Sequence, residues 1–301
     1  MSELLEKHGF HFQKKYGQNF LQDIKIPRRI AAECTDYALP DGFENGKEKI
    51  PALILEIGPG AGILTGELAK RFEKVVAVEI DRSLEGVLAE SLSPYDNAEV
   101  VFGDIMETDL SSLLAPRRTG KNGILPLSVC ANLPYYITTP ILMRLVESGM
   151  DFDYITVMVQ KEVAARLCAA PGSAEYGSIT AALGLYGTCK RLFSVPSGCF
   201  YPRPKVDSAI VRLNLYRPPR YTPETIEKAS RVIRAAFSMR RKTLSNTLAP
   251  LVGGDKAKIS AILASVGLAE TVRGETLCAA QYVRLAEALA ADASAEFTKS
   301  V

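Results

Sequence analysis

The sequence lacks the residue patterns that build metal sites, disulfide frameworks and membrane spans. It holds two histidines, His8 and His11, and six cysteines that form no CxxC pair. Zinc sites need closely spaced Cys and His ligands, so no metal site is predicted. The scattered thiols fit a reducing compartment, and the polar residues 1–15 lack the apolar core of a secretory signal. No run of about 18 apolar residues is present, so we expect no membrane span and a cytoplasmic location.

The small net charge of +2 conceals an uneven distribution along the chain. Residues 51–150 hold 8 Lys/Arg and 13 Asp/Glu, a balance of −5, whereas residues 201–250 hold 11 and 3, a balance of +8. A basic segment is either a solvated face or a surface for the phosphates of a nucleic acid. The acidic half does not favour a polyanion and should bind something else.

Strand-like and helix-like segments alternate through the first half of the chain. The apolar residues Leu53, Ile54, Leu55 and Ile57 form a short run of the kind found in buried parallel strands, and residues 63–72 have helical periodicity. Further strands are predicted to end at Glu79, Asp104 and Asn132, and another at 154–160 leads into a helix. This alternation predicts an α/β fold, Rossmann-like, with a mostly parallel sheet and helices on both faces.

The second half of the chain has a different organisation. Residues 196–205 are rich in turn formers, and residues 206–216 alternate like an edge strand. Residues 216–223 are typical of a linker, and residues 224–291 have helical periodicity throughout. We therefore predict a catalytic domain at 1–216 and a small helical C-terminal domain at 217–301.

A glycine turn, Glu56-x-Gly58-x-Gly60-x-Gly62, separates the first predicted strand from its helix. Glycines there allow a ligand to approach the backbone closely, at the carboxyl ends of the strands where open α/β sheets bind ligands. A tight turn without a ligand is the alternative. Dinucleotide sites have glycine at the last place of G-x-G-x-x-G, where this chain has Ile63. The spacing is similar to the first motif of methyltransferases.

Two acids follow at the ends of the next two predicted strands. Glu79 is placed to accept hydrogen bonds from the hydroxyls of a ribose, and Asp104 from an adenine amine. Either acid alone could be a solvated strand end. A glycine turn and two acids at successive strand ends together predict an adenosine-containing cofactor.

The fourth predicted strand ends in Asn132-Leu133-Pro134-Tyr135. An adenine N6 lone pair is delocalised into the ring, so two acceptors on its N–H bonds are needed to aim it at a methyl donor. The Asn132 side-chain oxygen and the Leu133 carbonyl can serve, because Pro134 restricts the conformation of Leu133. Tyr135 offers a face on which the base can stack. A simple turn with Tyr135 in the core is the alternative.

Two further aromatic residues have open assignments. Tyr136 can contact the acceptor pocket or simply pack. Phe200, in the turn-rich segment, can close the other side of an adenine sandwich or lie in the core or at the surface.

The chain resembles the KsgA-type (RsmA) ribosomal RNA adenine dimethyltransferases. The resemblance covers most of the chain and is specific because many motifs occur in the same order. The matching segments are KKYGQNFLQD (14–23), LEIGPGAGILT (55–65), VEID (78–81), GDIMETD (103–109), ANLPYYITTPIL (131–142), QKEVAARL (160–167), YGSIT (176–180), YPRPKVDSAIVRL (201–213) and AFSMRRKTLSNTL (236–248).

The resemblance implies a class I methyltransferase that uses S-adenosyl-L-methionine, without a metal, to dimethylate two adjacent adenosines near the 3′ end of 16S rRNA. Its partner would be the 30S subunit or a precursor, held in part by the helical domain. The residues implied at the cofactor are Asn19, Leu21, Gly58, Gly60, Glu79, Asp104 and Asn132. Tyr136 departs from many relatives, which carry a polar residue there, and this leaves the fine shape of the acceptor pocket open.

Basic side chains around the start of the helical domain are predicted to contact RNA phosphates near the acceptor pocket. Those singled out are Arg203, Lys205, Arg212, Arg231, Arg234, Arg240, Arg241 and Lys242, with Lys14 and Lys15 as additions.

Three other functions compete with this interpretation. An Erm-type enzyme would methylate the large-subunit 23S rRNA instead, although PKVDSA (204–209) and AFSMRRKTLSN (236–246) favour the small subunit. A non-catalytic RNA-binding assembly factor would not need the intact NLPY motif. An NAD-dependent oxidoreductase is disfavoured by Ile63. Because no long exposed apolar stripe is evident, we expect a monomer.

Overall fold

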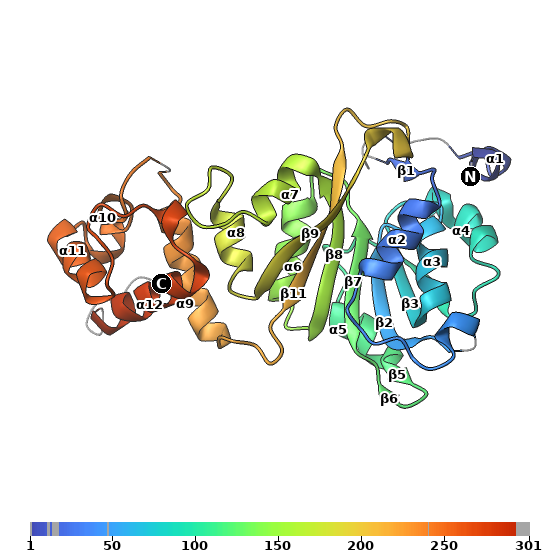
Figure 1. The fold of residues 1–301 in the computed structure, drawn as a ribbon, viewed down its shortest axis with the longest axis horizontal. Helices are drawn as coiled ribbons and strands as arrows, with labels where there is room; N and C mark the ends of the chain where they lie inside the picture. Colours follow the sequence, from blue (N-terminus) through green and yellow to red (C-terminus); the bar gives the residue numbers. More distant parts are fainter. Residues whose placement is uncertain (1, 11–12, 14–17, 47, 240, 293–301) are drawn as a thin grey trace. The chain divides into compact units, whose positions relative to one another are not determined.

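The computed structural model describes residues 2–10, 13, 18–46, 48–239 and 241–292. The chain forms two compact units, Met1–Ala164 with Lys190–Leu215, and Ala165–Cys189 with Tyr216–Val301 (Figure 1). The C-terminal part of the second unit begins at Tyr216, one residue before the predicted helical domain, and the unit also takes in residues 165–189. Tyr176, Ala181 and Leu185 from that segment are buried in its core, which explains the addition. The functional division into two domains stays a prediction.

Seven strands form the main sheet, and their order in space differs from their order in the chain (Figure 1). They are, from edge to edge, β4 (Ala98–Phe102), β3 (Phe72–Glu79), β2 (Ile50–Ile57), β7 (Leu127–Asn132), β8 (Phe152–Gln160), β11 (Ser208–Leu215) and β9 (Gly187–Val195). Strands β4, β3, β2, β7 and β8 are parallel, and β11 is antiparallel to β8. The predicted mostly parallel α/β sheet is therefore confirmed.

Helices cover both faces of this sheet. The helices of the first unit are α2 (Lys25–Glu33), α3 (Ile63–Arg71), α4 (Glu85–Ser91), α5 (Leu110–Leu114) and α6 (Thr138–Glu147), with α1 (Ser2–Lys7) at the N-terminal end, and α7 (Lys161–Leu167) runs across the division between the two units. Ile54 and Met158 share a core with Ile30 of α2 and Leu68 of α3. The next residue of β2, Leu55, points to the opposite face because strand side chains alternate, and it is also fully buried.

The prediction of an edge strand at 206–216 is wrong. The structure places β11 inside the sheet, between β8 and β9, and its first six residues are buried. The polar residues Ser208 and Arg212 gave the segment its apparent alternation, yet both are buried. The edge strand on this side of the sheet is β9. Its exposed Lys190 and Arg191 interrupt the apolar pattern that would have predicted a strand there.

The second unit is helical around its own core, as predicted. Its helices are α8 (Ser178–Leu183), α9 (Pro223–Ala236), α10 (Leu244–Thr247), α11 (Lys256–Ser265) and α12 (Ala279–Asp292). The Thr222 side chain caps α9 by accepting from the Thr225 N–H at 3.2 Å. Tyr282 is fully buried, and its hydroxyl donates to the Gly274 carbonyl at 2.8 Å.

Short elements complete the fold. The 3₁₀ turns are Phe43–Asn45, Arg82–Leu84, Ala115–Arg117, Ser197–Cys199, Ala249–Val252 and Gly274–Thr276, and two-residue strand pairs join β1 (Phe20–Leu21) to β10 (Phe200–Tyr201) and β5 (Thr119–Gly120) to β6 (Gly123–Ile124). Within the described residues, no helix has both the length and the apolar character that a bilayer crossing needs.

Candidate active site

The glycine turn lies at the carboxyl end of β2. Gly58, Gly60 and Gly62 have φ values of +70°, +59° and +81°, a region that residues with a side chain rarely adopt. A Cβ on Gly60 would stand 2.6 Å from Cε1 of Phe20. The segment around Phe20 can therefore lie against the turn only because residue 60 has no side chain.

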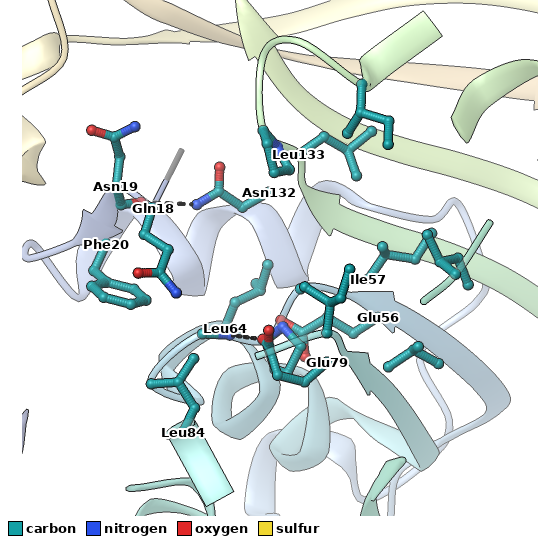
Figure 2. A pocket seen from close by; sticks show the side chains of 18 of the residues that line it. Gln18, Asn19, Phe20, Glu56, Ile57, Leu64, Glu79, Leu84, Asn132 and Leu133 are labelled. Carbon is teal, nitrogen blue, oxygen red and sulfur yellow. Dashed lines mark hydrogen bonds between the residues drawn. The ribbon is translucent and has the colours of Figure 1, made fainter. Parts of the chain in front are cut away.

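A cavity opens at this end of the sheet, between the carboxyl ends of the parallel strands and the segment 18–21 (Figure 2). The cavity encloses about 150 Å³ and is open to solvent at its mouth. Among its lining residues are Asn19, Leu21, Gly58, Gly60, Glu79, Asp104, Asn132, Leu133, Pro134 and Tyr135. The structure thus brings together every predicted cofactor and acceptor residue except Phe200.

Glu79 lines the cavity, and two backbone N–H groups hold its carboxylate in place. It is 4% exposed, and its carboxylate accepts from the Gly60 N–H at 3.1 Å and the Asp81 N–H at 2.8 Å (Figure 2). Burial raises the pKa of Glu79, while the two N–H donors act in the opposite direction. Its orientation is thus fixed by backbone groups of the same strand end and of the glycine turn.

Asp104 lies in a turn two residues beyond β4. Its Oδ1 accepts from the Met106 N–H at 2.8 Å, and its carbonyl accepts from the Thr108 hydroxyl at 2.7 Å. The side chain is half-buried at the edge of the cavity. These local bonds hold the Asp104 carboxylate at the cavity wall.

Asn132 is the last residue of β7, and one hydrogen bond orients its side-chain amide. Its Nδ2 donates to the Asn19 carbonyl at 3.3 Å, as Figure 2 shows. With the nitrogen engaged in this way, the amide oxygen is the group left to accept hydrogen bonds from a ligand. The bond also joins the acceptor motif to the segment that covers the cavity.

The three aromatic residues predicted near the acceptor differ in their surroundings. Tyr135 is half-buried, with its hydroxyl 2.9 Å from the Ser208 hydroxyl. Tyr136 lines the cavity and is 65% exposed. Phe200 is 3% exposed and packs in the core that contains Leu21 and Val195, so the structure does not bring it to the cavity wall.

The segment 18–21 is held over the cavity by contacts that the sequence analysis missed. Gln18 Nε2 donates to Asp81 Oδ2 at 2.7 Å, and Phe20 packs with Phe10 at a ring-centroid distance of 5.8 Å. Leu21 is buried in the core under α2. The polar residues of QNFL and VEID were visible as motifs, but nothing in the sequence indicated that Gln18 and Asp81 meet.

A second missed residue is Glu56, which lines the cavity but is only 1% exposed. Its Oε2 has no hydrogen-bond partner. Burial, with a smaller contribution from the charge of Glu79, raises its pKa to about 8, so Glu56 is mostly protonated at neutral pH. An acid inside the otherwise apolar run of residues 53–57 was the available signal.

The described residues that were predicted to contact RNA are divided between the two units. Arg203 and Lys205 are exposed in the first unit, and Arg241 and Lys242 are exposed in the second. Arg231 and Arg234 are exposed on α9, whereas Arg240, Lys14 and Lys15 lie outside the described residues.

The prediction for Arg212 is wrong. It is 2% exposed, forms an ion pair with Asp36 and donates to the Glu33 carbonyl at 3.0 Å. This arginine is a structural part of the sheet because β11 lies inside it.

The fold and the cavity define the class of protein. An open parallel sheet with a glycine turn after β2, an acid ending β3 and Asn-Leu-Pro-Tyr after β7 is a Rossmann-like methyltransferase domain. In the described part of the chain, no three His, Cys, Asp or Glu side chains are grouped to hold a metal ion.

Comparison with known proteins gives the family. Residues 9–291 match the model of the family described as ribosomal RNA adenine dimethylase. Proteins named ribosomal RNA small subunit methyltransferase A are 41% identical in Lachnoclostridium phytofermentans and 44% identical in Streptococcus pneumoniae, over 95% of this chain and 94% of each relative.

Solved structures agree with this family. A dimethyladenosine transferase from Plasmodium falciparum superposes with a TM-score of 0.69 and 25% identity, over 88% of this chain and 95% of that one. The 23S rRNA methyltransferase ErmE gives 0.63 and 26%, over 90% and 99%. The chain therefore belongs to the ribosomal RNA adenine dimethylase family and is a methyltransferase.

Proposed function

We propose that this protein uses S-adenosyl-L-methionine to dimethylate the N6 amines of two adjacent adenosines, in a hairpin loop near the 3′ end of 16S rRNA. It acts in the cytoplasm, on the small ribosomal subunit or its precursor, and needs no metal. The geometry of Asn132 carries the proposal, because its amide nitrogen is engaged by Asn19 while its oxygen is left to accept at the cavity.

The acceptor motif supplies two hydrogen-bond acceptors for one amine. The Asn132 oxygen and the Leu133 carbonyl accept from the two N6–H bonds, which localises the nitrogen lone pair for attack. The Pro134 carbonyl is tied by the Ile137 N–H at 3.2 Å, so the turn that carries these acceptors is closed. Tyr135, anchored through its hydroxyl on Ser208, gives the adenine a face to stack on. The proton leaves after transfer, when the methylated nitrogen is strongly acidic.

The remaining cavity residues fit the cofactor. Glu79 would accept from the ribose hydroxyls, Asp104 from the adenine amine, and the turn at Gly58 and Gly60 leaves room for the methionine end. Asn19 and Leu21, in the segment that covers the cavity, would exclude water. Bound S-adenosyl-L-methionine supplies an electrophilic methyl group on its sulfonium. The unpartnered Glu56 oxygen supports this fit, since a buried polar atom without a partner beside a cavity is available to a polar group of the ligand.

The comparisons favour the small subunit as the substrate. The relatives named small subunit methyltransferase A are 41% and 44% identical to this chain, against 26% for ErmE. The intact acceptor motif and the held Glu79 argue against a purely non-catalytic RNA-binding role.

Methyl transfer to separated 30S and 50S particles from cells lacking the endogenous enzyme tests the proposal. Wild type should form N6,N6-dimethyladenosine in 30S particles, and Asn132→Ala should lower the rate by about 100-fold or more, as loss of a preorganised polar group does in other enzymes. Asn122→Ala, at an exposed turn, is the matched control and should behave as wild type. Label on 50S particles would move the assignment to the Erm type. No label on either, with RNA binding intact, would favour an assembly factor.

A further inference from the structure

Tyr136 is the part of the acceptor motif that the proposed chemistry leaves without a role. It is 65% exposed, whereas Leu133 in the same turn is 1% exposed. Two of the exposed large hydrophobic side chains in the described residues line the cavity, and these are Ile80 and Tyr136. Single exposed hydrophobic residues are common on protein surfaces, so their place in the cavity has to decide what they mean.

The two residues stand on opposite sides of the glycine turn. Ile80 directly follows Glu79 at the end of β3, and Tyr136 follows the acceptor residues after β7. Strands β3 and β7 are the two neighbours of β2 in the sheet. A cofactor held by Glu79 would therefore lie on the Ile80 side of the cavity and leave the Tyr136 side to the second ligand, which is the RNA of the proposed function.

The backbone around Tyr136 is fixed before any ligand arrives. The Pro134 carbonyl accepts from the Ile137 N–H at 3.2 Å and from the Thr138 hydroxyl at 3.3 Å, so two hydrogen bonds close the turn that contains Tyr136. The preceding Tyr135 is anchored at Ser208. Tyr136 thus presents an aromatic ring at the cavity from a rigid turn, and stacking on it costs little conformational entropy.

We infer that Tyr136 stacks on the nucleobase adjoining the adenosine held in the acceptor pocket, an inference that rests on the proposed function. A target adenosine that enters the pocket leaves its stack, and its neighbour loses a stacking partner. Proteins that read single-stranded RNA replace that partner with an aromatic side chain. Tyr136 therefore helps to hold the RNA and takes no part in methyl transfer itself.

Two substitutions separate the aromatic face from mere apolar volume. Tyr136→Phe keeps the ring, and Tyr136→Leu keeps an apolar side chain without it. Steady-state methyl transfer is measured against the concentration of 30S particles, and cofactor Kd is measured by calorimetry. We expect Tyr136→Leu to raise KM for the particle about tenfold, the effect of losing one base–aromatic stack, with kcat and cofactor Kd near wild type. Tyr136→Phe should retain the wild-type KM.

Two more variants serve as controls. Ile124→Ala removes a side chain that is 79% exposed in β6 and should change nothing. Ile80→Ala should show the reverse pattern, a weaker cofactor Kd with an unchanged KM for the particle. This crossed result would support a cavity divided between cofactor and RNA.

Either of two results would overturn the inference. The first is a Tyr136→Leu enzyme whose KM for the 30S particle equals that of the wild type, when the wild type is active. The other is a Tyr136→Phe enzyme as impaired as Tyr136→Leu, since the hydroxyl would then be the group that matters. If the wild-type protein methylates neither particle, the proposed function fails together with the inference. That outcome can be told apart from the two Tyr136 results, because both of those require an active wild type.

Discussion

The buried acid Glu56 makes the stability of this protein depend on pH in a way that can be calculated. It sits in β2 with 1% exposure and one oxygen without a partner, and Glu79 lies close enough to add like-charge repulsion. Burial is the larger cause and Glu79 the smaller one, and together they raise the pKa of Glu56 from 4.5 to about 8. Replacing Glu56 by Gln leaves a neutral group of similar shape at every pH.

The sign of the effect follows from the protons bound in the two states. Between pH 4.5 and about 8, folded Glu56 keeps its proton while unfolded Glu56 has lost it. The free energy of unfolding therefore falls as pH rises through this window, by roughly 1.4 kcal/mol per pH unit. For Glu56 the loss is about 3 kcal/mol at pH 7 and approaches about 5 kcal/mol above pH 8. Below pH 4.5 the penalty is absent.

Urea unfolding from pH 5 to pH 9 measures this directly. Glu56→Gln should match wild type near pH 5, exceed its stability by about 3 kcal/mol at pH 7 and keep a gap of that size or larger at pH 9. Glu147→Gln, at an exposed position of α6, controls for the loss of one negative charge and should follow wild type. Parallel pH profiles for wild type and Glu56→Gln would refute the reasoning, because they would mean that Glu56 ionises alike in both states.

Two other variants test the glycine turn and the basic residues. Gly60→Ala places a Cβ 2.6 Å from the ring of Phe20 at a φ of +59°. It should lower cofactor affinity, measured by calorimetry, together with Tm, because the covering segment must move. Arg241→Ala with Lys242→Ala should weaken binding to 30S particles and reduce the salt slope of log K by about 0.7 for each phosphate that the protein no longer neutralises.

Matched variants sharpen both tests. Gly149→Ala also has a positive φ of +73°, but nothing lies within 4 Å of its added Cβ. It should lower Tm by backbone strain alone and leave cofactor affinity intact, and an equal fall in cofactor affinity in both glycine variants would contradict a role for the contact with Phe20. Arg212→Met removes one positive charge at a buried position, so it should leave the salt slope unchanged. An unchanged slope in the Arg241 and Lys242 variant would contradict phosphate binding there.

The sequence was sufficient to predict the sheet and most of the cavity lining because both depend on local patterns. Continuous apolar runs predicted buried parallel strands, and the carboxyl ends of parallel strands necessarily meet at one edge of the sheet. Glu79, Asp104 and Asn132 could therefore be assigned to one site from their positions at strand ends. Their roles toward cofactor and RNA are still predictions.

The errors came from side chains whose type does not reveal their environment. Arg212 has the charge of an RNA contact, yet it is buried because β11 lies between two other strands. Phe200 was left open between an adenine stack and a place in the core or at the surface, and it packs in a core with Val195. Burial in both cases depends on strand order, which the local pattern of a segment does not determine.

The contacts that close the cavity were beyond sequence reasoning for a related reason, and they show how the site is coupled. Asp81 donates its backbone N–H to Glu79 and accepts from Gln18 with its side chain. Asn19, the next residue along the chain, accepts from Asn132 through its carbonyl. The covering segment is thus bonded on one side to Asp81, at the strand end that carries Glu79, and on the other side to the Asn132 amide. A displacement of residues 18–21 therefore disturbs both halves of the cavity together, so cofactor binding and adenine binding should depend on the same closed arrangement.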